Sequence, residues 1–177
     1  MASGLRAKLQ AIAPGTAAPA RPAGGGLVVR VDRRKAPEGL LSLPRRGLAR
    51  MGAREDFDVG RSLFLDTETT GLSGGAGTVA FMVGAAYVEG GQLVTEQYVL
   101  GDYSDEPEML LRLGVLLARF DTAVTFNGKT FDMPLLQARY TLCRLREHWR
   151  DLAQLDLLHP ARRVWKLRLQ SCRLSNL

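Results

Sequence analysis

The chain is poor in cysteine, histidine and aromatic residues: its 177 residues include 2 Cys and 2 His, and 7% are aromatic. Cys143 and Cys172 stand outside any CxxC or Cys/His cluster, so the sequence predicts neither a disulfide framework nor a structural zinc site. It also lacks the roughly 18 to 20 consecutive apolar residues that a membrane span needs, and the N-terminus lacks the apolar stretch of a signal peptide. These absences favour a cytoplasmic protein with no membrane segment.

Charge is distributed unevenly along the chain. Residues 1–60 carry 11 Lys and Arg against 5 Asp and Glu, residues 61–138 carry 4 against 10, and residues 139–177 carry 9 against 3. An acidic centre between basic ends suits a protein that holds cations at carboxylates and a polyanion around them. The alternative is that the basic ends are ordinary solvated charge.

Composition divides the chain near residue 60. Ala, Pro, Gly and Arg dominate residues 1–60, with apolar residues only in short groups. Such a segment buries too little surface to offset the entropy lost on ordering. We therefore expect a largely disordered, basic leader over 1–60, with a short strand at 27–31, and one domain over 61–177. Since 46% of the residues are hydrophobic, that domain can bury a core.

Secondary structure in the second part alternates between strands and helices. A β-branched hairpin pattern surrounds residues 89–92, and helical spacing of apolar residues follows Ser104, which we expect to cap the helix. A Pro in the first turn marks a further helix, and a helix is expected to begin at 171–177. The predicted strands are 62–66, 78–88, 93–100, 122–126 and 152–158, and the predicted helices are 105–120, 133–142 and 161–166.

Two acidic residues end the first of these strands. Asp66 and Glu68 are two residues apart, and side chains alternate across a strand, so both carboxylates can point to one side. Hard oxygen ligands of this kind suit Mg²⁺ or Mn²⁺, and two such ions can promote phosphodiester hydrolysis. The spacing alone is weak, because a solvated strand end has the same pattern.

The surrounding residues make the pattern specific. The decamer LFLDTETTGL at 63–72 resembles the first motif of the DnaQ-like, or DEDD, 3′–5′ exonuclease superfamily, and FNGKTFDMPL at 126–135 resembles its second. A YprB-type ribonuclease-H-like domain is similar in the Gly-rich insert after the first motif and in LDLLHPARR at 155–163. The resemblance covers residues 62–177. It implies an α/β, ribonuclease-H-like mixed sheet with a three-stranded antiparallel start and then parallel strands, flanked by helices.

The resemblance also implies a site. It makes Asp66 the ligand that bridges two metal ions, Glu68 a ligand of the ion that activates water, and Asp132 an acid near the second ion. The same three residues are thereby the implied catalytic and metal-binding groups, with Mg²⁺ or Mn²⁺ as cofactor. The implied partner is a single-stranded DNA or RNA end.

The residues around the two motifs are implied to bind the substrate. The terminal nucleotide is expected along the backbone after Glu68, and apolar side chains would meet its base or sugar, although turn and core packing would explain them equally. Asn127 either bonds the substrate strand or caps its turn, and Lys129 either meets a phosphate or is an ordinary exposed lysine. The implied substrate-binding residues are Thr69, Thr70, Gly71, Leu72, Asn127, Lys129 and Phe131.

Other polar residues suggest weaker roles. The Gly-rich stretch 71–77 lacks the G-K-[ST] ending of a phosphate loop, and neither His148 nor His159 is expected to bind metal. Asp156 closes a predicted strand, and we expect it to support structure. An Arg-rich segment either lines a nucleic-acid path or is an amphipathic surface. It comprises Arg139, Arg144, Arg146, Arg150, Arg162, Arg163, Lys166 and Arg168.

The superfamily's third motif, an Asp four residues after a His or Tyr, does not occur after Asp156. We therefore expect a C-terminally truncated domain with impaired activity. The predicted function is metal-dependent 3′–5′ exonuclease hydrolysis of nucleic-acid phosphodiesters. The alternatives are a catalytically inactive, ribonuclease-H-like module that binds nucleic acid, and a structural acidic turn in an unrelated α/β domain.

Overall fold

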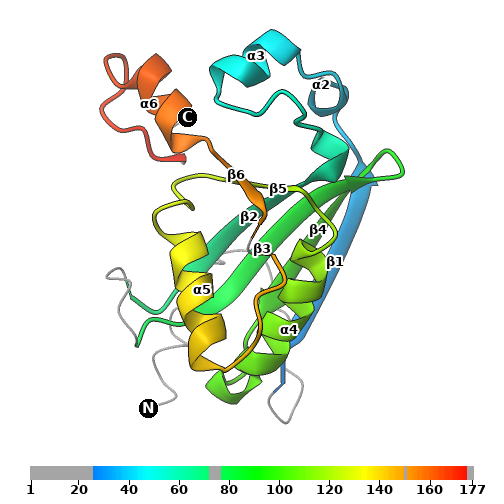
Figure 1. The fold of residues 1–177 in the computed structure, drawn as a ribbon, viewed down its shortest axis with the longest axis vertical. Coiled ribbons are helices and arrows are strands. Elements are labelled where there is room, and N and C mark those ends of the chain that lie inside the picture. Colours follow the sequence, from blue (N-terminus) through cyan, green and yellow to red (C-terminus); the bar gives the residue numbers. More distant parts are fainter. Residues whose placement is uncertain (1–25, 72–76, 150, 175–177) are drawn as a thin grey trace, which may run out of the picture.

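The computed structural model describes residues 26–71, 77–149 and 151–174. In these residues six strands form one sheet with the order β1-β4-β3-β2-β5-β6 (Figure 1). The pairs from β1 to β2 are antiparallel, whereas β2, β5 and β6 are parallel. This mixed sheet with flanking helices confirms the predicted fold class. The strands are β1 (Val28–Lys35), β2 (Ser62–Thr69), β3 (Ala80–Glu89), β4 (Gln92–Val99), β5 (Thr122–Thr125) and β6 (Ala153–Asp156).

Two helices, α4 (Glu106–Leu117) and α5 (Asp132–Leu142), cover one face of the sheet (Figure 1). Three shorter ones are α2 (Glu38–Leu41), α3 (Arg45–Arg50) and α6 (Leu158–Trp165), and single 3₁₀ turns are η1 (Val59–Arg61) and η2 (Tyr103–Asp105). Arg163 Nη1 on α6 donates a hydrogen bond to the Arg50 carbonyl, which joins α6 to α3. Within the described residues, no helix combines the length and apolarity that a membrane crossing requires.

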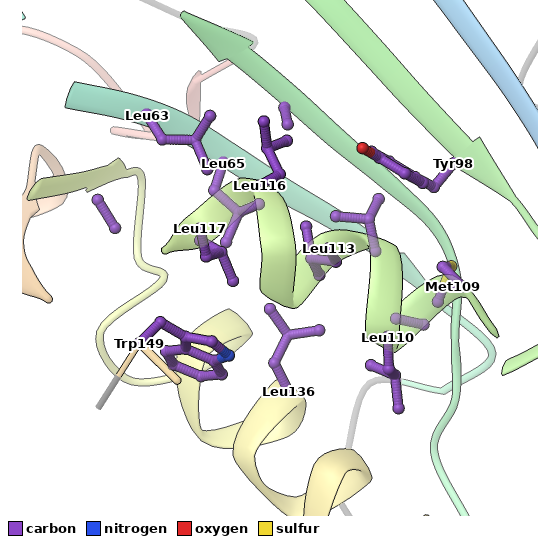
Figure 2. Close-up of a cluster of buried hydrophobic side chains, with 14 of the residues drawn as sticks. Leu63, Leu65, Tyr98, Met109, Leu110, Leu113, Leu116, Leu117, Leu136 and Trp149 are labelled. Atoms are coloured by element: carbon purple, nitrogen blue, oxygen red, sulfur yellow. The ribbon is translucent and has the colours of Figure 1, made fainter. Parts of the chain in front are cut away.

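The core lies between the sheet and these two helices. Leu63 and Leu65 on β2 are buried, as are alternate residues of β3 and β4, because side chains at every second position face the same side. The helical stripe of α4 packs onto them, and Leu136 of α5 and Trp149 close the far side (Figure 2). The labelled α4 residues of this cluster are Met109, Leu110, Leu113, Leu116 and Leu117.

The predicted hairpin between β3 and β4 is confirmed. Gly90 and Gly91 have φ of 56° and 76°, which is the left-handed backbone that a two-residue primed turn requires. The predicted cap of the next helix is wrong. The capping residue is Asp102 instead of Ser104. The Asp102 carboxylate accepts the N–H of Ser104, and the Asp105 carboxylate accepts the N–H of Asp102. An aspartate two residues earlier starts the 3₁₀ turn η2, and α4 continues from it.

Strand β1 lies inside the segment that composition suggested was a leader. It pairs with β4 along its whole length, from Val28 opposite Val99 to Lys35 opposite Gln92. Its outer residues are charged and exposed, a common property of edge strands, so the apolar pattern of a buried strand is missing. The sheet therefore begins before residue 61, and the strand is longer than the predicted 27–31. Residues 1–25 lie outside the described part of the chain.

The other predicted strands and helices agree with their expected positions to within a few residues, whereas α2 and α3 lie in the segment expected to be disordered. The helix expected at 171–177 is different, since residues 171–173 have no helical structure and 175–177 lie outside the described residues.

A buried ion pair joins the two long helices. Arg139 on α5 donates through Nε and Nη2 to both carboxylate oxygens of Glu106, the first residue of α4. Glu106 is 4% exposed, and its hydrogen bonds hold the pKa of Arg139 above its usual value. Near the same place the Tyr140 hydroxyl donates to the Leu110 carbonyl. These contacts hold α4 and α5 in one relative position.

Removal of the acid should therefore destabilise the domain. Glu106→Ala removes the carboxylate that pairs with the largely buried Arg139, and breaking a buried ion pair typically costs about 3 kcal/mol or more. Urea unfolding should show this loss. The matched control is Glu108→Ala on the same helix, whose pair with Arg112 is more than half exposed on both sides and should cost below about 1 kcal/mol. Equal losses in the two variants would contradict this account.

Candidate functional site

The two acids of the first motif lie within β2. Leu63, Leu65 and Thr67 alternate toward the helices, so Asp66 and Glu68 share the opposite face of the strand. Asp66 is paired with Gly84 of β3, which has no side chain, and the residue is exposed. The two carboxylates are therefore on one side of β2, as the spacing predicted.

The third acid reaches this strand from α5. Asp132 is in the first turn of α5, where the helix dipole favours a negative charge, and it is 4% exposed. Its Oδ1 atom accepts two hydrogen bonds from Thr67, one from the backbone N–H at 3.1 Å and one from the hydroxyl. Thr67 is the residue between Asp66 and Glu68. The start of α5 is thereby bound to β2 at the level of both acids.

Asp66 and Asp132 interact electrostatically. Burial raises the pKa of Asp132, the Thr67 hydroxyl opposes this, and the charge of Asp66 raises the pKa further. Burial also raises the pKa of Asp66, because its carboxyl lies partly among protein atoms although the residue is exposed, and the Thr67 N–H opposes the increase. Both groups thus lose solvation in the fold, and their negative charges repel each other.

The structure does not gather the three acids into a ligand cluster. Within the described residues, no three His, Cys, Asp or Glu side chains form a group that could hold one metal ion. Asp66 and Asp132 interact electrostatically, and Glu68 lies two residues beyond Asp66 on β2. The role of these three residues as metal ligands remains a proposal.

Asp156 holds the second motif in place. It ends β6 and is buried, and its Oδ1 atom accepts the N–H groups of Asn127 and Leu158 at 2.8 and 3.0 Å. Its Oδ2 atom accepts the N–H of Lys129 at 3.1 Å. The predicted structural role of Asp156 is confirmed: one carboxylate fixes the loop that leads from β5 into α5.

That loop requires a tight backbone. Asn127 has φ of 70°, its side-chain oxygen accepts the Thr130 hydroxyl at 2.8 Å, and its carbonyl accepts the N–H of Phe131. At Gly128 an added Cβ would lie 2.4 Å from Cβ of Thr125, so a side chain does not fit. Of the two roles considered for Asn127, capping of the turn is the one these contacts support. Lys129 is exposed and Phe131 is half-buried.

The turn after β2 is also well bonded. The Thr69 hydroxyl donates to the Gly71 carbonyl at 2.7 Å, the Thr70 N–H donates to the Val79 carbonyl at 3.0 Å, and the Val79 N–H donates to the Thr70 hydroxyl at 3.1 Å. These residues are half-buried beside Glu68. Leu72, the other predicted substrate contact of this turn, lies outside the described residues.

A cavity of about 410 Å³ lies at the opposite end of the parallel strands, where Thr122 and Ala153 begin β5 and β6. Exposed His148 lines it together with two ion-paired residues, Arg54 and Arg61. It is remote from Asp66 and Asp132, which lie toward the strands' carboxyl ends, so it is not part of the carboxylate site.

Sequence reasoning missed Thr67. A threonine between two acids gave no signal of its own, because its contact with Asp132 joins residues 65 positions apart. The motifs indicated that the two segments meet, but only the fold identifies which atoms connect them.

Comparison with known proteins places these residues in a family. The family model described as the RNase_H superfamily matches residues 63–177. The uncharacterized protein YprB of Bacillus subtilis (strain 168) is 37% identical over 123 residues, which is 68% of this chain and 29% of that protein. The aligned part thus spans less than a third of the relative's length.

The raised pKa of Asp132 predicts a stability change. Since folding favours the protonated acid, its contribution is fully present below the unfolded pKa of about 3.9 and is lost as pH rises through the raised folded pKa. At pH 7 the ionised carboxylate of Asp132 therefore destabilises the fold. Asp132→Asn removes this destabilisation, and the amide oxygen of the substituted side chain can still accept both hydrogen bonds from Thr67. Without metal, the variant should unfold at a higher urea concentration than wild type at pH 7, and the difference should shrink toward pH 4.

The control for this prediction is Asp32→Asn, at an exposed position on β1. This variant should leave the free energy of unfolding within about 0.5 kcal/mol of wild type at both pH values. A gain at Asp32 equal to that at Asp132, or a loss at Asp132, would contradict the assignment.

Proposed function

Since the chain belongs to the RNase_H superfamily, we propose that this domain hydrolyses nucleic-acid phosphodiesters as a metal-dependent 3′–5′ exonuclease. The observation that carries the proposal is the bond between Asp132 and Thr67. It brings an acid from α5 to the strand segment that holds Asp66 and Glu68. Membership supports a nuclease-type fold in general, while the exonuclease direction rests on the resemblance of the two motifs.

The donor set suits a hard divalent cation. Asp66 and Asp132 are carboxylates that have lost solvation, and each is made more basic by its surroundings. A cation between them would relieve their repulsion, and Glu68 on the same face of β2 as Asp66 offers a third carboxylate. We propose that Asp66, Glu68 and Asp132 hold Mg²⁺ or Mn²⁺, with two ions as the resemblance to the exonuclease superfamily implies. When bound, such ions supply Lewis-acid stabilisation of charge in phosphodiester hydrolysis.

The protein's own residues position the substrate. In this proposal the terminal nucleotide lies along the backbone at Thr69, Thr70 and Gly71, where hydrogen bonds to Val79 fix the turn. A fixed turn binds the nucleotide without ordering itself at that moment, which favours a productive geometry. Phe131, at the start of α5, presents an aromatic side chain beside Asp132. Lys129 is exposed on the same loop and is proposed to approach a phosphate.

The substrate in this proposal is a single-stranded DNA or RNA end. The principal alternative is a module with the same fold that binds nucleic acid without cleaving it. The absence of a three-ligand cluster among the described residues favours this alternative. An exonuclease needs the acidic residues for cleavage, whereas a module that only binds nucleic acid does not. Cleavage rates of variants at these residues distinguish the two functions.

Loss of the first acid should abolish cleavage. A 5′-labelled single-stranded oligonucleotide incubated with the chain and Mg²⁺ or Mn²⁺ should shorten stepwise from its 3′ end, whereas a 3′-labelled one should release its label as a mononucleotide. Asp66→Ala and Asp132→Asn should each reduce the rate about 100-fold or more, because changes even to residues that support metal ligands cost 10- to 100-fold. Denaturing gel electrophoresis over a time course measures the rates.

Asp32→Asn serves again as the control, and its rate should equal that of wild type. If wild type and Asp66→Ala are equally inactive while both still bind the oligonucleotide, the non-catalytic module is the correct reading. Shortening from the 5′ end would refute the proposed direction.

Metal binding should also stabilise the fold. A ligand that binds only the folded state adds RT ln(1 + [L]/Kd), about 2.7 kcal/mol at 100 times Kd. Mg²⁺ or Mn²⁺ should thus raise the melting temperature of wild type by a few degrees, and the double variant Asp66→Asn, Asp132→Asn should show no such rise. Scanning calorimetry tests this. An equal rise in both proteins would place the ion elsewhere, and no rise in wild type would contradict a metal site.

A further inference from the structure

A second cavity lies at the carboxyl ends of β5 and β6. Its volume is about 400 Å³, and it is bounded by the loop after β5 on one side and by α6 with the segment that follows it on the other. Six of its lining residues determine its chemistry: Phe126, Asn127, Leu158, Arg162, Ser171 and Arg173. We refer to it as the β5–α6 cavity.

The β5–α6 cavity carries positive charge. Arg162 and Arg173 are the charged residues among the described residues that line it, and both are exposed. The nearby acid, Asp156, already accepts three backbone N–H groups at the base of the loop. Two guanidinium groups beside one cavity suit a phosphate, which arginine binds through paired N–H donors.

The same cavity has apolar surface. Leu158 is buried and Phe126 is half-buried, so an aromatic ring and an aliphatic side chain lie within reach of a ligand. A flat aromatic group such as a nucleobase stacks on a phenyl ring regardless of its sequence identity. The polar contacts available beside this surface are the exposed Asn127 and the half-buried Ser171. The combination of phosphate and base chemistry is that of a nucleotide.

The position of the cavity links it to the carboxylates. In the parallel pair β2 and β5, Ser62 lies opposite Thr122 and Phe64 opposite Val124. β5 ends at Thr125, so Phe126 is the first residue of the loop beyond its carboxyl end, and Asp66 lies two residues beyond Phe64 on β2. Phe126 and Asp66 thus lie toward the same carboxyl-terminal edge of the parallel strands, where the proposed function puts the substrate.

A basic surface continues away from the cavity. Arg163 and Lys166 follow Arg162 along α6 and its end, and all three are exposed. The bond from Arg163 to the Arg50 carbonyl brings the arginines of α3 to the same side. A polyanion that leaves the cavity thus meets further positive charge.

We infer that the β5–α6 cavity binds an internal nucleotide of a single-stranded nucleic acid, with its base against Phe126 and its phosphate between Arg162 and Arg173. This inference deepens the proposed function and rests on it, since it assigns the residues that hold the strand next to the terminal nucleotide. A single strand is specified because a base within a duplex has no free face to stack on Phe126.

Binding without cleavage tests the inference. A fluorescein-labelled dT15 strand and a labelled 15-base-pair duplex are titrated with the 177-residue chain in EDTA, and anisotropy is followed at several salt concentrations. Arg162→Ala with Arg173→Ala should weaken dT15 binding about 10-fold at low salt. The slope of log K against log salt should fall by about 0.7, since the two arginines share one phosphate and each single-strand phosphate contact contributes about 0.7.

Two further variants distinguish the contribution of the cavity arginines to dT15 affinity from two others. These are base stacking on Phe126 and the general attraction of the strand to any exposed positive charge. Phe126→Leu keeps an apolar side chain but removes the ring, so dT15 affinity should fall while the salt slope stays that of wild type. Arg34→Ala with Lys35→Ala removes two exposed charges from β1 at the opposite edge of the sheet, and it should change neither quantity. Melting curves of the two charge variants should match wild type, because the side chains that they remove are exposed.

The inference is overturned if the Arg162 and Arg173 variant binds dT15 like the Arg34 and Lys35 variant. It is also overturned if the duplex binds as tightly as dT15 and depends equally on Arg162 and Arg173. These outcomes are distinct from failure of the proposed function. Arginine-dependent binding in a protein that never cleaves supports the cavity and refutes the exonuclease, whereas cleavage that needs Asp66 with normal binding in the arginine variant does the opposite.

Discussion

The arrangement of both the carboxylate site and the β5–α6 cavity depends on the Asp156 carboxylate. By accepting the N–H groups of Asn127, Lys129 and Leu158, it joins the end of β6 to the loop after β5 and to the start of α6. Hydrogen bonds to a charged acceptor are stronger than neutral ones, and this acceptor is buried. The loop it fixes leads directly to Asp132, so an acid with no proposed chemical role determines where a proposed ligand lies.

A second constraint is that the site is assembled from desolvated charge. Asp66 and Asp132 both have raised pKa values, with burial as the largest cause, and Thr67 offsets part of the cost with hydrogen bonds to Asp132. Asp132 keeps its place despite this repulsion because both of its bonds from Thr67 tie it to β2. Destabilised charge of this kind is common at functional sites, and in the proposed function it is the physical reason for binding a cation.

Much of the fold could be predicted from local patterns. The hairpin of β3 and β4 was evident from glycines at its turn, and α4 from its apolar spacing, since both depend on residues close in sequence. β1 was not recognised as part of the sheet because an edge strand with Val28 at one end and Arg33, Arg34 and Lys35 at the other has no buried face to create a pattern. The cap of α4 was misplaced because Asp102 and Ser104 are both residue types that cap helices well. Which of the two forms the cap depends on backbone geometry.

The site was predictable in part. Motif order indicated that the first and second acidic segments belong together, but the atoms that connect them, on Thr67 and Asp132, are separated by 65 positions and follow no spacing rule. For Asn127 the sequence allowed two roles, and only the bonds to Thr130 and Phe131 distinguish them. For the β5–α6 cavity the sequence indicated only Arg162, within a basic segment, because Phe126 and Arg173 line one cavity only when β6 and α6 have folded.

The pairing of β1 with β4 has a consequence for how the chain reaches its fold. Val28 pairs with Val99, which is 71 positions later in the chain, so β1 leaves the ribosome well before its partner strand has been made. Closing so long a loop is entropically slow compared with forming the β3–β4 hairpin. Strand β1 is therefore expected to be among the last strands of this sheet to dock. Its run of charged side chains keeps it hydrated during the interval, when an apolar strand would be available for aggregation.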